Sequence, residues 1–478
     1  MRPNIPARWI FLSTLGALSA SGAEHHVPED HSSIQAAIDA ARDGDEVIVA
    51  AGTYTGADNK NLTLDGKDLL LRSADGAETT VIDCAGTGTG FILDGSSAAE
   101  SGEIRGFTVT GGANKTGGGM EIQGRCTTVI RDCVITRNKG KTDASGGKGG
   151  GIYVSGSDAN PRITGCTISE NGGWIQWGGG IYVDSASPTV ENCLFLANRS
   201  SRNGGAIHSK DGEANPTFTN CVVQDNYTTA SSGYGDGGGV SATSNGHVTL
   251  TNCTIRENYT SNSAKKGGGL FVEENSEAEL TNCIIWGNSP REIEGREDEV
   301  EITYSDVSGG WAGTGNLDSD PLWAAEDDFH LDWQSPCIDA GTSRGAPADD
   351  IDSDRRPQGD GIDMGADEYI TCDLQVTLSN YPNELSPLDT LSFYAEASNP
   401  CTEARTFDEA LMKVGGPATL SKPLYAGNTL SLEPGDSLGS EIHLPVPPAT
   451  PLGSYDVEII ILRQGDGLGS AAFAVELH

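Results

Sequence analysis

A sixfold repeat between Thr116 and Asn288 constrains the fold of this chain more than any other feature of its sequence. Each copy contains a glycine cluster, a short apolar stretch, a gap, and then a Cys that is followed five residues later by an Asn. The cysteines are Cys133, Cys166, Cys193, Cys221, Cys253 and Cys283, and the paired asparagines are Asn138, Asn171, Asn198, Asn226, Asn258 and Asn288. Units of about 30 residues that cannot bury a core alone indicate a stack of similar repeats.

Each copy divides into three short strands, which in the copy around Cys193 are residues 180–183, 188–191 and 193–196. Alternation of side chains turns one side of each strand inward. The inward position after the glycines holds Met120, Ile152, Ile181, Ile207, Val240 and Leu270, and the inward position before the cysteine holds Ile130, Ile163, Val190, Phe218, Leu250 and Leu280. This pattern predicts an all-β fold, a right-handed parallel β-helix with three short strands per coil and about 4.8 Å between coils.

The bends between strands support the same prediction. The residue before each cysteine is Asp132, Gly165, Asn192, Asn220, Asn252 or Asn282. Asn tolerates the left-handed backbone conformation of a tight bend, and stacked Asn amides hydrogen-bond along the axis. The glycine clusters give a second bend the same freedom.

The phrases Gly-Gly-Gly-Ile-Tyr-Val and Thr-Asn-Cys-Thr-Ile resemble those of the pectin-lyase-like β-helix superfamily, in particular its secreted bacterial repeat proteins. The resemblance covers residues 27 to 369. It includes the opening phrase Ser-Ile-Gln-Ala-Ala-Ile-Asp-Ala-Ala and the closing phrase Ser-Pro-Cys-Ile-Asp-Ala-Gly. It implies the fold and leaves the activity open, because that superfamily contains lyases, hydrolases, esterases, epimerases, adhesins and inert stalks.

Residues 1–23 have the pattern of a signal peptide. Arg2 and Arg8 precede an apolar run from Trp9 to Ala20, and small residues follow it. A membrane anchor is the alternative, but about a dozen apolar residues are too few to span a bilayer. The sequence therefore predicts a protein that is secreted or held at the cell surface and does not span a membrane.

Residues 24–369 are predicted to form the β-helix with its caps. Ser32 or Ser33 can N-cap a helix over residues 34–42 that covers the first coil. The repeat decays after Asn288, so residues 289–369 are expected to form the final coils and a C-terminal cap. Residues 370–478 lose the glycine clusters and carry short alternating strands, which predicts an antiparallel, immunoglobulin-like β-sandwich.

Net charge and cysteine positions limit the partners and cross-links. The formal charge of −38 argues against a nucleic-acid partner, since phosphate binding needs a basic surface.

Six of the eleven cysteines occupy equivalent inward positions. Their spacing of about 4.8 Å exceeds what a disulfide prefers, so they are expected to be unpaired. Cys372 and Cys401 lie outside the repeats and are the predicted disulfide pair.

Aromatic and basic residues follow the strand after the glycines. Its outward position holds Glu121, Tyr153, Tyr182, His208, Ser241 and Phe271. Aromatic faces with nearby cations can hold sugar rings and uronate carboxylates. The predicted substrate-binding residues, some of them in neighbouring loops, are Tyr153, Trp174, Trp177, Tyr182, Arg202 and Phe271. The alternative is that tyrosines suit exposed strands and cations keep loops soluble.

Asp184, His208 and Lys210 are the candidate catalytic residues, because they lie on adjacent coils of the same face. A lyase needs a base near the sugar C5 proton and a cation that acidifies it. The chain lacks the paired aspartates and Gly-His-Gly phrase of polygalacturonases and an obvious calcium cluster of the pectate-lyase kind. An ordinary surface histidine is therefore the alternative interpretation of His208.

No cofactor is predicted, apart from a possible calcium site. Asp350, Asp352 and Asp354 alternate, but Arg355 and Arg356 stand where an EF-hand needs its glycine. An EF-hand is therefore rejected. A looser calcium site that uses Asp350, Asp352 or Asp363 stays open.

Two functions remain compatible with the sequence. The first is an exported, non-catalytic β-helix that binds cell-surface or extracellular polysaccharide, with the C-terminal module for attachment. The second is a polysaccharide lyase or a related uronan-acting enzyme that uses the same face.

Overall fold

The computed structural model describes residues 22–140, 146–173, 175–212, 215–229, 235–261, 267–326 and 328–370, together with Pro382 and the strands of a C-terminal unit. The chain divides into two compact units, Met1–Tyr369 and Ile370–His478. Most of the predicted signal peptide lies outside the described residues, as do Trp174, Cys372 and Cys401.

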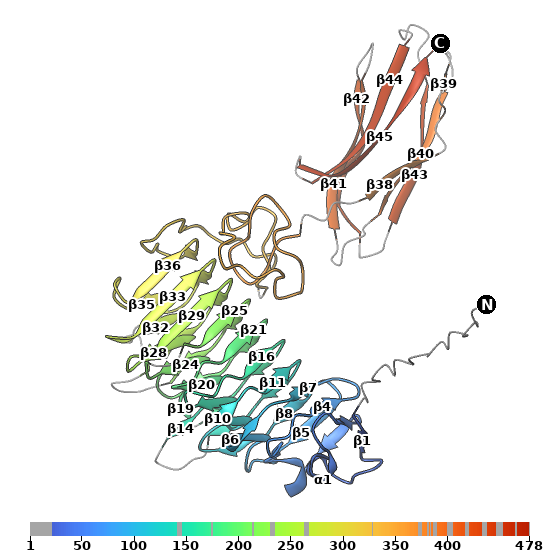
Figure 1. Ribbon diagram of the computed structural model, residues 1–478. Helices are drawn as coiled ribbons and strands as arrows, with labels where there is room; N and C mark the ends of the chain where they lie inside the picture. Colours follow the sequence, from blue (N-terminus) through green and yellow to red (C-terminus); the bar gives the residue numbers. More distant parts are fainter. Residues whose placement is uncertain are drawn as a thin grey trace, which may run out of the picture. The chain divides into compact units, whose positions relative to one another are not determined.

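Three long sheets of parallel strands wind through the first unit as a solenoid (Figure 1). The eleven-stranded sheet contains β1 (Glu24–Val27), β2 (Glu46–Val49), β4 (Leu70–Ser73), β7 (Glu103–Arg105), β11 (Val129–Arg131), β16 (Arg162–Thr164), β21 (Thr189–Glu191), β25 (Thr217–Thr219), β29 (His247–Thr251), β33 (Glu277–Thr281) and β36 (Val300–Thr303). The ten-stranded sheet contains β3 (Gly52–Tyr54), β5 (Thr80–Asp83), β8 (Thr108–Thr110), β12 (Val134–Thr136), β17 (Thr167–Ser169), β22 (Leu194–Leu196), β26 (Val222–Gln224), β30 (Thr254–Arg256), β34 (Ile284–Trp286) and β37 (Asp306–Val307). The eight-stranded sheet contains β6 (Phe91–Glu100), β10 (Met120–Cys126), β15 (Ile152–Ser155), β20 (Ile181–Asp184), β24 (Ile207–Lys210), β28 (Val240–Thr243), β32 (Leu270–Val272) and β35 (Ile293–Glu294).

Short strands add small sheets at the bends of the coils. They are β9 (Ala113–Asn114), β13 (Lys139–Gly140), β18 (Gly172–Gly173), β14 (Gly147–Lys148), β19 (Ile175–Trp177), β23 (Arg199–Ser200), β27 (Tyr227–Thr228) and β31 (Tyr259–Thr260). Helix α1 (Ile34–Ala40) precedes β2, and a 3-10 turn spans Ala57–Asn59. The Ser33 side chain accepts a hydrogen bond from Ala36 N at 3.3 Å, so Ser33 is the N-cap. The helix ends at Ala40, two residues before the predicted end at Arg42.

The inward columns align as the repeat predicts. Ile130, Ile163 and Val190 are direct partners on neighbouring strands, and all three are buried. The six repeat cysteines are also buried and free, which confirms that they are unpaired. The Cys133 and Cys166 amides donate to the sulfur of the next cysteine at 3.5 and 3.4 Å, so this thiol column carries weak hydrogen bonds along the axis.

Both predicted bends adopt left-handed backbone conformations. The residues before the cysteines have φ values of 52, 63, 51, 48, 48 and 54° at Asp132, Gly165, Asn192, Asn220, Asn252 and Asn282. The first glycine of each cluster has φ between 60 and 70° at Gly117, Gly149, Gly178, Gly204, Gly237 and Gly267. A Cβ at Gly150 would lie 2.4 Å from the Gly179 carbonyl oxygen, so the clusters also let successive coils approach closely.

The paired asparagines form a buried amide ladder, which we define as Asn138, Asn171, Asn198, Asn226, Asn258 and Asn288. The Asn171 backbone N–H and Nδ2 both donate to Asn198 Oδ1 at 3.1 Å, and the same pair of bonds recurs from coil to coil. Each Nδ2 also donates to a carbonyl, as Asn198 does to Ile168 O at 2.7 Å. The side-chain amides of the ladder therefore all point the same way along the axis.

Glu292 ends this amide ladder. Asn288 Nδ2 donates to Glu292 Oε2 at 2.6 Å, and the Asn288 N–H lies 3.1 Å from both carboxylate oxygens. The donor end of the aligned amides thus meets an acceptor. Burial raises the pKa of Glu292 to about 7, although the Asn288 hydrogen bonds oppose this rise.

We expect Glu292→Gln to remove part of the pH dependence of β-helix stability. An unfolded Glu titrates near pH 4.3, whereas folded Glu292 titrates near pH 7. The folded state therefore keeps its proton in this window while the unfolded state loses it, and Glu292 lowers the stability as the pH rises through the window. Urea midpoints measured from pH 4 to 7.5 should fall less steeply in the variant than in the wild type. The exposed Glu279→Gln is the control, and parallel curves for Glu292→Gln and the wild type would contradict the assignment.

After β37 the described residues up to Tyr369 form turns and isolated bridges, and we call residues 317–369 the fold-back segment. It lies along the corner asparagines and the outer face of the ten-stranded sheet. The side-chain amides of Asn220, Asn252 and Asn282 donate to its backbone carbonyls. The sequence predicted final coils and a cap here. The outward residues of β30 and β34 are Thr254, Arg256, Ile284 and Trp286, and the fold-back segment packs against them.

A second apolar cluster shows how the fold-back segment is attached. Ile284 of β34 packs with Leu331, Cys337 and Met364, all of them buried. Arg256 of β30 is buried as well, and its guanidinium donates to the carbonyls of Asp328 and Glu326. Repeat periodicity could not reveal this attachment, because the fold-back segment is not a repeat.

The second unit contains two sheets. The three-stranded antiparallel sheet has the order β38 (Gln375–Ser379), β40 (Thr390–Ser398), β43 (Ser437–Pro445). The five-stranded sheet has the order β39 (Glu384–Leu385), β45 (Asp466–Leu477), β44 (Gly453–Arg463), β41 (Arg405–Gly415), β42 (Leu420–Leu432). The immunoglobulin-like sandwich and the Cys372–Cys401 disulfide stay predictions.

Candidate functional site

The predicted aromatic column lies on the outer face of the eight-stranded sheet. Tyr153, Tyr182 and His208 are direct partners on β15, β20 and β24, and their rings stack at 5.7 and 5.1 Å. The alignment of this column is as predicted. Its exposure is not, because only 8, 1 and 1% of these three residues is accessible. Phe271 continues the column on β32 and is half-buried.

His208 is a buried, neutral histidine. Its Nδ1 lies 2.6 Å from Ser241 Oγ, and its Nε2 lies 3.4 Å from Thr243 Oγ1. Burial lowers the pKa of His208 to about 3, so its imidazole is uncharged at neutral pH and is a weak base. The alternative interpretation of His208 as an ordinary surface histidine is therefore wrong, and the ring has the surroundings of a structural group.

The other two catalytic candidates lie beside His208 but already have ionic partners. Asp184 and Lys210 are direct neighbours on β20 and β24. Lys148 Nζ lies 3.1 Å from Asp184 Oδ2, and Lys210 Nζ lies 3.3 Å from Asp211. The structure thus brings the three candidates together, with the possible base Asp184 paired to a lysine.

The cations predicted to attract uronates rest on aromatic rings of this chain. The Arg202 guanidinium lies 5.1 Å from the centroid of the Trp177 ring, and Lys148 Nζ lies 5.0 Å from that of Tyr182. Both cations therefore already have an aromatic partner in this chain, and the Tyr182 ring is also stacked between Tyr153 and His208. Binding of a ligand at this column stays a prediction.

Two of the three calcium candidates bind backbone amides. Asp350 Oδ1 accepts hydrogen bonds from the amides of Asp352 and Asp354, and Asp363 accepts from Asp339 N and Tyr369 N. Both carboxylates are buried and order the fold-back segment. Calcium binding stays a prediction, and Asp352 is the one of the three candidates whose carboxylate is exposed.

A different surface, the outer face of the eleven-stranded sheet, carries the more open site. Two outward positions of each strand form rows along the axis. In the C-terminal half both rows are dominated by hydroxyls, and we call these residues the threonine face: Thr189, Thr217, Thr219, Thr249, Thr251, Thr281 and Thr303. All of them are half-buried, with their outer parts accessible.

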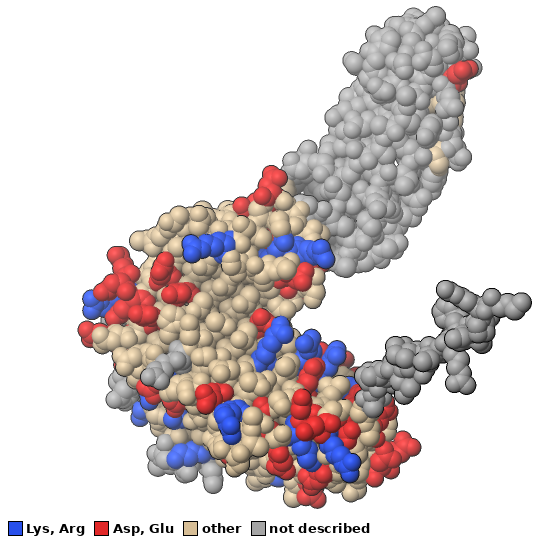
Figure 2. Space-filling model, viewed as in Figure 1, with Lys and Arg blue, Asp and Glu red and all other residues tan. Residues whose placement is uncertain are grey.

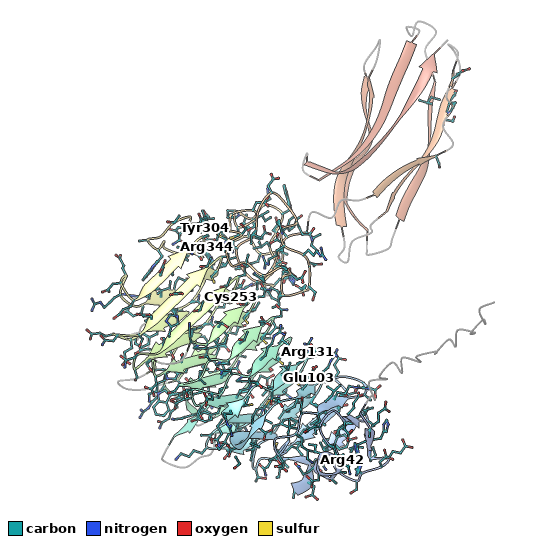
Figure 3. The ribbon with its side chains drawn as sticks, in the orientation of Figure 1. Arg42, Glu103, Arg131, Cys253, Tyr304 and Arg344 are labelled. Carbon is teal, nitrogen blue, oxygen red and sulfur yellow. The ribbon has the colours of Figure 1, made fainter. Side chains whose placement is uncertain are left out.

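A groove of about 600 Å³ lies between the last strands of the threonine face and the fold-back segment, and we call it the threonine groove. Its lining includes Thr251, Glu279, Thr281, Glu301, Thr303, Tyr304, Thr314, Thr342, Arg344 and Gly345. Figure 3 places Tyr304 and Arg344 together at the C-terminal end of the solenoid. Tyr304 follows β36 at the bend that Asn282 occupies one coil earlier, and its φ of 48° is the left-handed conformation of that bend.

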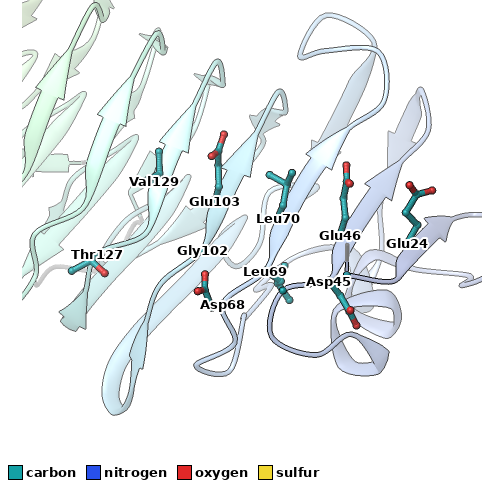
Figure 4. Close-up of a pocket in the computed structure, with 12 residues that line it drawn as sticks. Glu24, Asp45, Glu46, Asp68, Leu69, Leu70, Gly102, Glu103, Thr127 and Val129 are labelled. Atoms are coloured by element: carbon teal, nitrogen blue, oxygen red, sulfur yellow. The ribbon is translucent and has the colours of Figure 1, made fainter. Parts of the chain in front are cut away.

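The N-terminal half of the same sheet is charged. A hollow of about 530 Å³ there is lined by Glu24, Glu46 and Glu103. Glu24 and Glu46 stand on the neighbouring strands β1 and β2, and Glu103 of β7 follows beyond Leu70 of β4 (Figure 4). The arginines nearby are paired with carboxylates: Arg131 with Glu103 at 3.4 Å, Arg105 with Asp132 at 3.1 Å, and Arg162 with Glu191 at 2.6 Å.

Charge therefore changes along this sheet. Figure 2 shows a hollowed surface with basic side chains on its lower side and largely uncharged atoms in the middle. Because the arginines are neutralised by their partners and Glu279 and Glu301 line the groove, the surface does not favour a polyanion. It suits a ligand that is rich in hydroxyls.

Sequence reasoning missed the threonine groove, although part of its signal was present. Thr217 and Thr219 flank the inward Phe218, and Thr249 and Thr251 flank Leu250, so outward hydroxyls at neighbouring coils were readable. The other wall, with Thr342 and Arg344, comes from the fold-back segment and has no repeat register to place it.

The family described as right handed beta helix region matches residues 73–238. The solenoid is a right-handed parallel β-helix. The matched stretch covers coils of all three long sheets, and the remaining parallel strands continue the same β-helix on both sides.

Comparison with curated proteins finds no match, whereas solved structures give several. The pectate lyase Pel9A is 16% identical over 73% of this chain and 97% of its own, with a TM-score of 0.44. Spo0M, a sporulation control protein from Bacillus subtilis, is 10% identical over 22% of this chain and 49% of its own, with a TM-score of 0.17. A β-glucosidase from Listeria innocua is 15% identical over 22% of this chain and 16% of its own, again with a TM-score of 0.17. At these scores, nothing those proteins bind or cleave is transferred to this chain.

Membrane insertion through a helix finds no support in the described residues. None of their helices has both the length and the apolar character that a bilayer crossing requires.

Proposed function

We propose that this β-helix is an exported, non-catalytic protein that binds extracellular polysaccharide along its eleven-stranded sheet. The threonine groove is the observation on which the proposal depends. Export rests on the charged and apolar pattern of the first 23 residues.

The chemistry of the groove suits sugars. Hydroxyls such as those of Thr281 and Thr303 donate and accept hydrogen bonds, the carboxylates of Glu279 and Glu301 accept, and Arg344 donates. Sugar hydroxyls need this mixture. The threonine face continues beyond the groove at the strand spacing of about 4.8 Å, which favours an extended polymer over a compact ligand.

The carboxylates of the groove favour sugar binding over glycoside hydrolysis, because neither is placed to act as a general acid. Glu279 and Glu301 are direct partners on adjacent strands, an arrangement that brings two carboxylates near one sugar. A glycosidase also needs one of its two carboxyls buried so that it stays protonated. Both of these residues are exposed, so nothing in the groove supplies that environment.

We expect Arg344→Ala combined with Thr281→Val to weaken glycan binding about tenfold, since each removes hydrogen bonds of about 0.5–1.5 kcal/mol or more. Affinity electrophoresis in neutral, uronate and sulfated polysaccharides, followed by calorimetry with the best ligand, measures this. Thr110→Val, at a half-buried threonine of β8 in the ten-stranded sheet, is the matched control and should bind normally. Binding that survives the double variant but is lost in Trp177→Ala would move the site to the aromatic column, and absence of binding to every glycan would refute the proposal.

The lyase alternative is tested with the same preparation. Incubation with pectate, alginate and sulfated glycans plus calcium should give no absorbance from unsaturated products. Product that disappears in Lys210→Ala would overturn the non-catalytic part and favour a uronan-acting enzyme.

A further inference from the structure

Four side chains of the fold-back segment gather outside the threonine groove. His330 Nε2 lies 3.0 Å from Asp352 Oδ2, and Asp367 Oδ2 accepts a hydrogen bond from Leu331 N at 2.8 Å. The ligand atoms of His330, Asp352 and Asp367 all lie within 4.8 Å of one another. Asp328 completes the group through a hydrogen bond to His330 Nδ1.

We propose that His330, Asp352 and Asp367 bind one divalent transition-metal ion of the Zn²⁺ class, which joins three stretches of the fold-back segment. An ion bonded at about 2.0–2.2 Å to nitrogen and carboxylate oxygen fits among donor atoms at these separations. The three residues come from separate turns, around residues 330, 352 and 367, so a shared ion would cross-link them.

Neighbouring carboxylates hold the donors in the way that commonly orients metal ligands. The Asp328 carboxylate binds Nδ1 of His330 and leaves Nε2 directed at Asp352, the pairing that commonly orients a ligating imidazole. Asp350 Oδ1 holds the amide of Asp352 at 2.9 Å, which fixes that turn.

Arg256 fixes the His330 turn from the β-helix side. Its buried guanidinium donates to the carbonyls of Asp328 and Glu326 and lies 4.7 Å from the centroid of the Trp323 ring. The His330 turn is therefore held against β30 before any ion binds. Preorganised donors lose little entropy on binding a metal.

Charge balance favours a cation at this position. Three carboxylates, those of Asp328, Asp352 and Asp367, surround one imidazole, and Asp367 is only 7% accessible. A protonated His330 would neutralise one of three negative charges. A divalent ion would neutralise two, in a segment that has little regular secondary structure of its own to hold it together.

The donor set selects the class of metal. Ca²⁺ takes six to eight oxygen ligands, whereas this site offers one imidazole and two carboxylates. Imidazole suits Zn²⁺, Co²⁺ and Ni²⁺, and Zn²⁺ takes three protein ligands plus water readily. This site shares Asp352 with the predicted calcium site but not Asp350 or Asp363, whose carboxylates bind backbone amides.

Metal content and thermal unfolding of the full chain test the proposal. After chelation and dialysis against Zn²⁺, mass spectrometry should find one ion per chain, and the midpoint of β-helix unfolding should rise with Zn²⁺ but not with equimolar Ca²⁺. Co²⁺ should give a visible spectrum of nitrogen and oxygen ligands without the sulfur-to-metal band that a cysteine site would show.

Three variants test whether these residues bind a metal ion or form only a network of ion pairs. Asp352→Asn changes a half-exposed side chain, keeps the turn, and should abolish both the bound ion and the Zn²⁺-dependent shift. His330→Ala should do the same, even if it lowers the metal-free midpoint. His247→Ala removes a histidine that pairs with Glu277 at 3.4 Å elsewhere and should retain the ion. Zn²⁺ retention in Asp352→Asn and His330→Ala, or no retained Zn²⁺ in the wild type, would overturn the proposal.

Discussion

Asn198→Ala should destabilise the β-helix by about 2–6 kcal/mol, because it leaves two buried donors of the preceding coil without an acceptor. Those donors are the backbone N–H and Nδ2 of Asn171, both 3.1 Å from Asn198 Oδ1. The variant also takes a donor from Ile168 O and Asn226 Oδ1. Urea unfolding monitored by circular dichroism measures the loss.

Asn192→Gly is the control for this experiment. Asn192 lies six residues earlier, at a bend with φ of 51°, which glycine adopts without strain. Its loss should cost less than about 1 kcal/mol, since only the single bond from Asn220 Nδ2 disappears. Equal effects at both positions would mean that the amide ladder contributes no more than an ordinary surface amide.

Arg356→Met should detach the fold-back segment from the β-helix, at a cost of about 3–5 kcal/mol for the uncompensated charge of Glu368. The Arg356–Glu368 pair, 2.8 Å apart, has both side chains fully buried. Arg356 also donates to the carbonyls of Gly365 and Ala366, and these carbonyls lie where the segment meets β30. Limited proteolysis should cut the variant within residues 317–369 while the coils stay resistant.

The double variant Arg356→Met with Glu368→Leu distinguishes the effect of an unpaired buried charge from the effect of changed packing. Removing both charged groups should recover much of the lost protease resistance, because no buried charge then stays unpaired. Protease resistance in Arg356→Met equal to that of the wild type would show that the fold-back segment is held by its apolar contacts around Met364 alone.

The features that could be predicted from the sequence are those that recur in every repeat. The inward columns, the free cysteines and the left-handed bends recur in every copy, so each copy supports the others. The exposure of Tyr182 was predicted wrongly, because strand alternation shows which way a side chain points and not what covers it. The threonine groove could not be predicted in full, because Arg344 lines it from outside the repeats. Contacts between residues 60 or more positions apart leave no periodic pattern in the sequence.

The fold-back segment makes the two ends of the solenoid unequal. It bonds to the corner amides of Asn220, Asn252 and Asn282, which belong to three successive coils. These three coils are not expected to unfold one at a time, because all of them are bonded to the same fold-back segment. We therefore expect unfolding to begin in the N-terminal coils. The three C-terminal coils should unfold last, in one cooperative step.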